Sequence, residues 1–411
     1  MAVTKMSKTF KTLFLAVSLL LAGFTIAGTL GVRASAGDKD GAYPQLGVYS
    51  EVLSKVKNEY VEEPNIGNVT DGALHGLLEA LDANSSYLTP AEYKQYMSVK
   101  EAKGNIGAVL SKRVGYAMVV SVIPGGPADK AGINNGDIIE SVEGRSTHEI
   151  SLAELRGMMS GQVGSNINVA VVRPRKAQPQ KLTITRDVVK EPPVVSKMLA
   201  DQIGLIDVET LSAGKVQEVA RQVVDAQNKG AKKIILDLRN CAEGDPNEGV
   251  ALANLFLNHG SVGYVQGQKY PKQTFTVDAS KAITALPLVV LVNRSTAGAA
   301  EVAAAAILEN ARGDLVGDKT FGSGSIQKTI TMQDGSALIL SVAKYYTPSG
   351  KAIQDTAVTP NILVADSSDD VVLPEEDAEP APDTEQPKEK KNDDQLKRAI
   401  EVLTKGNDKK A

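Results

Sequence analysis

The alternation of strand and helix signals in the second half of this 411-residue chain constrains its fold most. Lys233–Arg239 and Pro287–Val292 are short, mainly apolar runs, as expected of strands that are buried on both faces. Ile203–Val208 predicts another strand, and Ala213–Lys229 predicts a helix that ends at a glycine. We therefore expect an α/β (α+β) core of mixed sheet and helices over residues 191–365.

A glycine- and proline-rich signature lies upstream of this core. It reads Ile123-Pro124-Gly125-Gly126-Pro127-Ala128-Asp129 and continues as Gly136-Asp137-Ile138-Ile139. This pattern resembles a PDZ domain, a small β-barrel or sandwich with helices, inserted over residues 104–190. PDZ domains hold an extended peptide by strand addition and bind its C-terminal carboxylate with backbone N–H groups.

The PDZ resemblance implies two peptide-binding segments. One is a loop and strand, formed by Ile106, Gly107, Ala108, Val109 and Leu110. The other is a helix whose apolar residues would line the groove: Leu152, Leu155 and Met159. Because backbone N–H groups bind the peptide, peptide binding tolerates side-chain substitutions better than catalysis does. The alternative is a spacer whose groove is closed.

Two polar, glycine-containing blocks follow the PDZ-like segment. The first is Asn293-Arg294-Ser295-Thr296-Ala297-Gly298-Ala299-Ala300-Glu301, and the second is Thr320-Phe321-Gly322-Ser323-Gly324-Ser325-Ile326-Gln327. With Lys344–Gln354, they resemble the carboxyl-terminal processing peptidases, also called tail-specific proteases. That family has a serine nucleophile in the first block and a lysine base in the second. The ungapped match places the nucleophile at Gly298 and the base at Ser323.

Neither residue can perform the chemistry that the resemblance implies. Acyl transfer needs a hydroxyl nucleophile and an unprotonated amine, but glycine has no nucleophilic atom and serine is a very weak base. The family's oxyanion loop corresponds to Asn240–Gly244, where Glu243 replaces a glycine next to Gly244. A carboxylate there opposes oxyanion stabilisation. The polar Gln327 is retained, but no catalytic set is intact.

Three functional hypotheses remain. The first is a non-catalytic protein that binds peptides or proteins, or regulates them. The second is an active serine-type endopeptidase that acts on protein C-terminal regions with substitute groups. A register shift would make Ser295 or Thr296 the nucleophile. Other nearby side chains that could take part are the amines of Lys319, Lys328 and Lys344 and the hydroxyls of Ser323 and Ser325. The third is a structural or assembly scaffold of the cell envelope.

The N-terminus predicts export. Lys5, Lys8 and Lys11 precede an uncharged stretch from Thr12 to Val32, and an A-x-A-like site follows at Ala34–Ala36. Residues 1–36 therefore predict either a cleaved secretory signal or an uncleaved membrane anchor. Both place the remaining chain across the cytoplasmic membrane, in a periplasmic or membrane-anchored envelope location.

The remaining segments complete the predicted domain organisation, and the composition limits the classes of binding partner. We expect a helical region over 43–103 and an acidic, proline-rich, disordered tail over 366–411, in which Leu396–Leu403 forms one helix.

A net charge of −4 without a basic patch that contains aromatic residues argues against nucleic acid as a binding partner. Cys241 is the single cysteine, so no intrachain disulfide forms, and no metal or cofactor motif is recognised. The expected partners are peptide or protein C-termini, another copy or an active peptidase relative, with membrane contact only through the N-terminal segment.

Overall fold

The computed structural model describes residues 43–99, 103–113, 115–173, 178–365 and 393–405. Its internal contacts divide the chain after Thr70 into two compact units, each of which is described by itself. The first contains helix α2 (Tyr43–Glu59) and the start of α3 (Ile66–Glu79). The predicted signal or anchor segment lies outside the described residues. Within the described ranges, no helix is both long and apolar enough to span a bilayer.

A six-stranded sheet forms the core of the larger unit. Its order is β19-β16-β15-β11-β9-β8, and all adjacent pairs are parallel except β8 with β9. The three predicted strands are confirmed with slightly shorter bounds, as β9 (Ile203–Asp207), β11 (Lys233–Asp237) and β15 (Leu288–Val292). Three strands that were not predicted complete the sheet: β8 (Val195–Met198), β16 (Asp314–Gly317) and β19 (Ile362–Leu363). A 3-10 turn, η1 (Ala200–Gln202), precedes β9.

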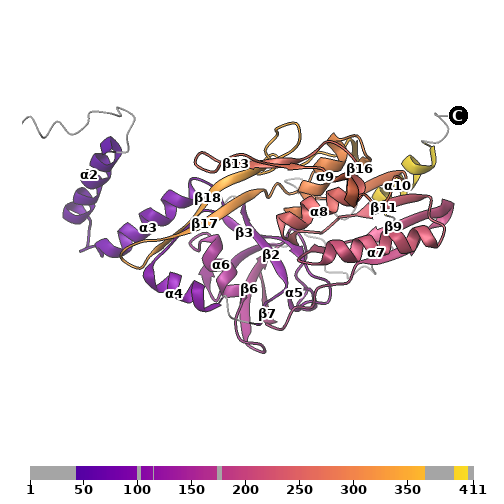
Figure 1. Ribbon diagram of the computed structural model, residues 1–411. Helices are drawn as coiled ribbons and strands as arrows, with labels where there is room; N and C mark the ends of the chain where they lie inside the picture. The colour runs from indigo at the N-terminus through magenta and orange to yellow at the C-terminus, as the bar shows by residue number, and fades with distance from the viewer. Residues whose placement is uncertain (1–42, 100–102, 114, 174–177, 366–392, 406–411) are drawn as a thin grey trace, which may run out of the picture. The chain divides into compact units, whose positions relative to one another are not determined.

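Helices cover both faces of this sheet, which explains the apolar runs. Ile234 and Leu236 of β11 pack into a cluster with α7 (Lys215–Asn228), α8 (Pro246–Phe256) and α9 (Ala299–Glu309). Ile235, between them, faces a second cluster that includes residues of α10 (Asp394–Lys405). Successive side chains of a strand point to opposite faces, so each face obtains its own apolar set. Figure 1 shows α7 and α8 beside β9 and β11.

Helix α10 modifies the expectation for the C-terminal tail. The expected helix at Leu396–Leu403 is present and longer, and its Ala399 and Leu403 are buried against the sheet. Residues 394–405 are therefore ordered, because their apolar stripe covers the second face of the sheet. Arg239 binds Asp393 through two hydrogen bonds of 2.9 Å and also pairs with Asp237. The predicted disorder of residues 366–392 and 406–411 falls outside the described residues.

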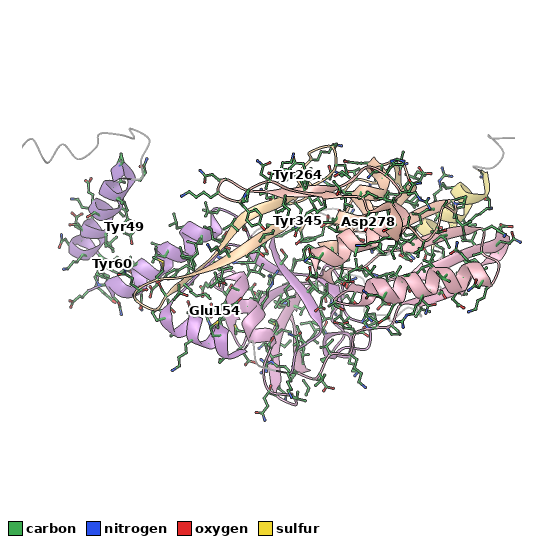
Figure 2. The ribbon with its side chains drawn as sticks, in the orientation of Figure 1. Tyr49, Tyr60, Glu154, Tyr264, Asp278 and Tyr345 are labelled. Carbon is green, nitrogen blue, oxygen red and sulfur yellow. The ribbon has the colours of Figure 1, made fainter. Side chains whose placement is uncertain are left out.

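A second sheet in the larger unit pairs strands that are far apart in the sequence. Its order is β1-β18-β13-β14, and β17 pairs with the long strand β18. The bounds are β1 (Ser86–Leu88), β13 (Ser261–Gln266), β14 (Gln273–Thr276), β17 (Ser325–Thr331) and β18 (Ala337–Tyr346), and the 3-10 turn η2 (Ala279–Lys281) follows β14. Tyr264 and Tyr345, labelled in Figure 2, come from the neighbouring strands β13 and β18.

The PDZ-like segment has its own sheet and core. Its order is β2-β3-β4-β6-β7, with β5 beside β4. The elements are β2 (Ala108–Arg113), β3 (Tyr116–Val122), α5 (Pro127–Lys130), β4 (Ile138–Val142), β5 (Arg145–Ser146), α6 (Leu152–Met159), β6 (Asn166–Val172) and β7 (Gln180–Thr185). They form one group in Figure 1.

The segment before the PDZ strands belongs to the larger unit from Asp71 onward. Helix α4 (Pro90–Val99) begins after Thr89, because Thr89 and Glu92 form a reciprocal capping pair. Strand β1 then pairs with β18, and its Leu88 is fully buried. The predicted helical region 43–103 therefore also contains a strand, β1, which joins the second sheet.

Candidate functional site: a peptidase-like elbow without its nucleophile

The first block forms a sharp turn between β15 and α9. Gly298 lies at the start of α9 with φ +60° and ψ −117°, a conformation that residues with side chains adopt only at a cost. Such a strained strand-to-helix turn presents the nucleophile in elbow-type hydrolase sites. A Cβ built at Gly298 would meet only the Ala242 carbonyl oxygen, at 3.9 Å. The elbow therefore has room for a side chain, and glycine leaves it chemically empty.

The carboxylate of Glu301 joins the two blocks. Its Oε2 accepts hydrogen bonds from the backbone N–H groups of Gly298 (3.0 Å) and Ser323 (2.8 Å). Its Oε1 accepts from the N–H of Gly322 at 2.8 Å and from the Thr320 hydroxyl. The positions that align with the family nucleophile and base are thus held by one oxygen atom.

Glu301 is fully buried, so its charge state depends on these donors. Burial raises the pKa of the Glu301 carboxyl to about 7, and the hydroxyl and the three N–H donors oppose the increase. The sequence comparison used Glu301 only to fix the register. Its structural role could have been inferred from its place three residues after the helix start, where a carboxylate reaches back to the backbone.

Ser323 occupies the loop that faces the elbow, and its side chain is half-buried. Both of its neighbours in the chain are hydrogen-bonded to residues near 355. Gly322 accepts a hydrogen bond from the N–H of Asp355 at 3.1 Å, and the Gly324 N–H donates to Gln354 at 2.9 Å. Gln327 lies farther along β17, exposed, and donates to Ser325 at 2.7 Å. The structure thus brings Gly298 and Ser323 together, whereas Gln327 binds within its own strand.

The oxyanion-like loop is fixed by a pair of asparagines. The Asn240 N–H donates to the Asn293 side chain at 3.0 Å, and the Asn293 amide donates to the Asn240 side chain at 2.9 Å. The Ala297 N–H donates to the Cys241 carbonyl at 3.0 Å, so the loop and the elbow are in direct contact. Sequence analysis missed this pair. The available signal was an asparagine shortly after each of two neighbouring core strands.

Glu243 and Gly244 form β12, which pairs in parallel with β10 (Thr210–Leu211). A Cβ at Gly244 would lie 2.8 Å from Leu211, so this position requires glycine. Glu243 has no such constraint and is exposed. Desolvation by the surrounding chain raises the pKa of the Glu243 carboxyl, and the negative charge of Glu191 adds to the effect.

Thr296 and Ser295 are the alternative nucleophiles of the first block, and Ser295 lines the same pocket as Lys319. Thr296 is fully buried, and its hydroxyl donates to the Leu238 carbonyl at 2.8 Å and accepts from the Asn293 N–H. Ser295 is 8% exposed. Among the amines, Lys328 and Lys319 are exposed, and Lys344 lies 3.8 Å from the Asp355 carboxylate.

The eight predicted peptide-binding residues lie together in the PDZ segment. Most are buried in its core, where each is at most 2% exposed: Ile106, Leu110, Leu152, Leu155 and Met159. Ala108 and Val109 are half-buried, and Gly107 has φ +73°. The buried residues of α6 and β2 therefore belong to one apolar core. The peptide-binding role of these residues stays a prediction.

Comparison with known proteins agrees with this architecture. Residues 202–364 match the model of peptidase family S41, and residues 118–173 match a PDZ domain. The chain is 30% identical over 350 residues to the carboxy-terminal processing protease CtpA of Bacillus subtilis, covering 84% of this chain and 74% of the relative. It is 32% identical over 280 residues to the carboxyl-terminal-processing protease of a Picosynechococcus species, covering 66% of this chain and 67% of the relative.

A solved structure shares the fold as well. The photosystem II D1 C-terminal processing protease superposes with a TM-score of 0.65 at 25% identity, covering 78% of this chain and 93% of that one. The chain therefore belongs to peptidase family S41, among the PDZ-containing carboxy-terminal processing proteases.

Proposed function

We propose that this protein is an exported, non-catalytic member of its family that binds peptides or proteins. The observation that carries the proposal is the elbow, which keeps its strained turn at Gly298 but has no side chain there. Ser323 stands at the position of the lysine base, and a hydroxyl cannot take a proton near neutral pH. Because the members of such a set act as a unit, the loss of both removes the chemistry.

The surroundings of the elbow support a retained scaffold without turnover. Glu301 still binds the backbone of both blocks, so the frame persists in the absence of the reacting groups. Glu243 adds a carboxyl group next to the loop where negative charge would develop. An active peptidase would instead need Ser295 or Thr296, and the Thr296 hydroxyl is already held by two backbone groups.

The PDZ domain supports a binding role. We propose that it takes the free C-termini of peptides or proteins by strand addition at β2, which has β3 on one side only. The partner of such a protein is then a peptide tail, another copy or an active relative. Export rests on residues 1–36, as a cleaved signal or as an anchor.

Restoration of activity tests the non-catalytic proposal. Gly298→Ser alone should leave an unstructured protein substrate intact, because no base is present. Gly298→Ser with Ser323→Lys, and with Glu243→Gly added, should produce measurable cleavage. Cleavage by the Gly298→Ser variant alone would contradict the role given to Ser323.

Matched peptides test the binding proposal. A peptide with an apolar free C-terminus should bind with roughly micromolar affinity, because an added strand buries less than a standard interface. Amidation of that C-terminus should weaken binding about tenfold or more in calorimetry. If no peptide binds in either form, the PDZ domain is a spacer and the scaffold hypothesis is favoured.

A further inference from the structure

A cleft of about 300 Å³ lies between the PDZ strand β2 and the peptidase-like elbow. Its wall combines residues of β2, of helix α6 and of both site blocks, among them Leu110, Arg113, Arg156, Ala297 and Ser323. Ala297, which precedes Gly298 in the elbow, Ser323 of the second block and the edge of the PDZ sheet thus open onto one space. A peptide that adds to β2 would pass along it.

Arg156 of α6 occupies the free edge of β2. Its guanidinium donates to the carbonyl oxygen of Leu110 at 3.2 Å. Strand β2 pairs only with β3 among the described strands, so its other edge is the one available for strand addition. A peptide strand there would offer a backbone N–H to the same carbonyl. Peptide entry and the bond from Arg156 therefore compete.

The charges around the cleft leave Arg156 without a carboxylate. The lining cations are Lys112, Arg113 and Arg156, and Asp355 is the single acid among the described lining residues. Lys112 pairs with Glu79 at 2.6 Å, and Asp355 lies 3.8 Å from Lys344. No described carboxylate forms an ion pair with Arg156, whose side chain reaches solvent at the cleft. The surrounding chain still lowers the pKa of its guanidinium by desolvation.

We propose that Arg156 is a specificity-determining residue that selects an acidic side chain in the peptide bound along β2. The inference rests on the proposed binding function and adds a substrate class to it. When the peptide takes over the Leu110 carbonyl, it also covers the cleft that Arg156 lines, so the displaced guanidinium needs a new partner. A glutamate or aspartate side chain supplies two oxygens that match the planar guanidinium. A neutral peptide leaves the cation unpaired.

A purely structural role would give a different result. If Arg156 only clamps β2 to α6, its removal changes stability and weakens every peptide equally. The discriminating quantity is therefore the ratio of affinities for an acidic and a matched neutral peptide. That ratio is insensitive to a general loss of binding.

The experiment uses the full exported chain and peptides with one apolar, free C-terminus. Glu is compared with Gln at each of several interior positions by calorimetry. In the unmodified protein, one position should favour Glu about tenfold or more, the effect of one charge-assisted hydrogen-bond set. Arg156→Gln should bring this ratio to about one, and Arg156→Lys should keep part of it.

Arg145→Gln is the matched control. Arg145 of β5 forms an ion pair of 2.6 Å with Glu154, which lies on α6, the helix of Arg156, and is labelled in Figure 2. Arg145 does not line the cleft. Its removal should leave the Glu-to-Gln ratio unchanged. If Arg156→Gln does not fold, the Glu-to-Gln affinity ratio of the unmodified protein is measured at low and high salt instead. The preference for Glu should decrease at high salt, because salt screens the ion pair between Arg156 and the peptide carboxylate.

Two outcomes would overturn the inference alone. They are peptide binding with no preference for Glu at any position, and a preference that persists unchanged in Arg156→Gln. A salt-independent preference likewise contradicts it. Failure of all peptides to bind the folded protein would instead contradict the proposed binding function and the inference together.

Discussion

Replacing Glu301 by glutamine should destabilise the protein most at low pH. The glutamine side chain retains one acceptor oxygen, which can serve the N–H groups of Gly298 and Ser323. Its NH₂ group then faces the N–H of Gly322, which loses its acceptor. One buried, unsatisfied N–H costs about 1–3 kcal/mol. This is the expected loss in the free energy of unfolding when the native carboxyl is protonated.

The pH dependence follows from the pKa of Glu301. Burial raises that pKa from 4.5 to about 7, so the folded state binds more protons than the unfolded state between these values. The carboxyl's contribution to stability is therefore present below pH 4.5 and decreases as pH rises to 7. At about 1.4 kcal/mol per pKa unit, the decrease is about 3 kcal/mol. The amide of the Glu301→Gln variant does not titrate, so the deficit of the variant should shrink over this range.

Urea unfolding followed by circular dichroism at pH 5, 6 and 8 measures this difference. The control is Glu51→Gln on the exposed face of α2, which should change the free energy of unfolding little at each pH. A deficit for Glu301→Gln that is constant or grows with pH would refute the burial argument. A variant as stable as the unmodified protein at pH 5 would refute the hydrogen-bond argument.

Two further predictions concern the same core. Gly317→Ala should destabilise by about 3 kcal/mol or more, because its Cβ would clash with the Val292 carbonyl oxygen, whereas Gly298→Ala should cost only about 1–3 kcal/mol of backbone strain. Urea midpoints compare them, and equal losses would contradict the contrast. The Cys241 thiol should react slowly with iodoacetamide in the folded protein at pH 8, because burial raises its pKa, with the nearby acids adding to the increase. Mass spectrometry detects the adduct, and labelling as fast as in urea would contradict this.

The sequence predicted those parts of the fold that depend on local pattern. The apolar runs that became β11 and β15 were predicted to within two residues, because strands covered by helices on both faces need continuous apolar side chains. The helix that ends at Gly230 was likewise predicted, and α7 (Lys215–Asn228) lies within its predicted bounds. The family and the mixed α/β core were confirmed by the comparisons.

The features that the sequence did not reveal depend on distant contacts. The bond from Arg156 to Leu110 joins residues 46 positions apart, and the pair between Arg239 and Asp393 joins residues 154 positions apart. No periodicity encodes such partners. The burial of Leu152, Leu155 and Met159 in the PDZ core depends on the same kind of contact, because an apolar helix face predicts equally well a groove wall and a packed core.

The most direct test of the account is whether the unmodified protein cuts peptide bonds. The secretion-processed chain is incubated with an unstructured protein substrate, and products are followed by mass spectrometry over days, beside the Gly298→Ser, Ser323→Lys variant. The account predicts no new fragments from the unmodified chain. Fragments that appear with it and disappear on Ser295→Ala or Thr296→Ala would contradict the account.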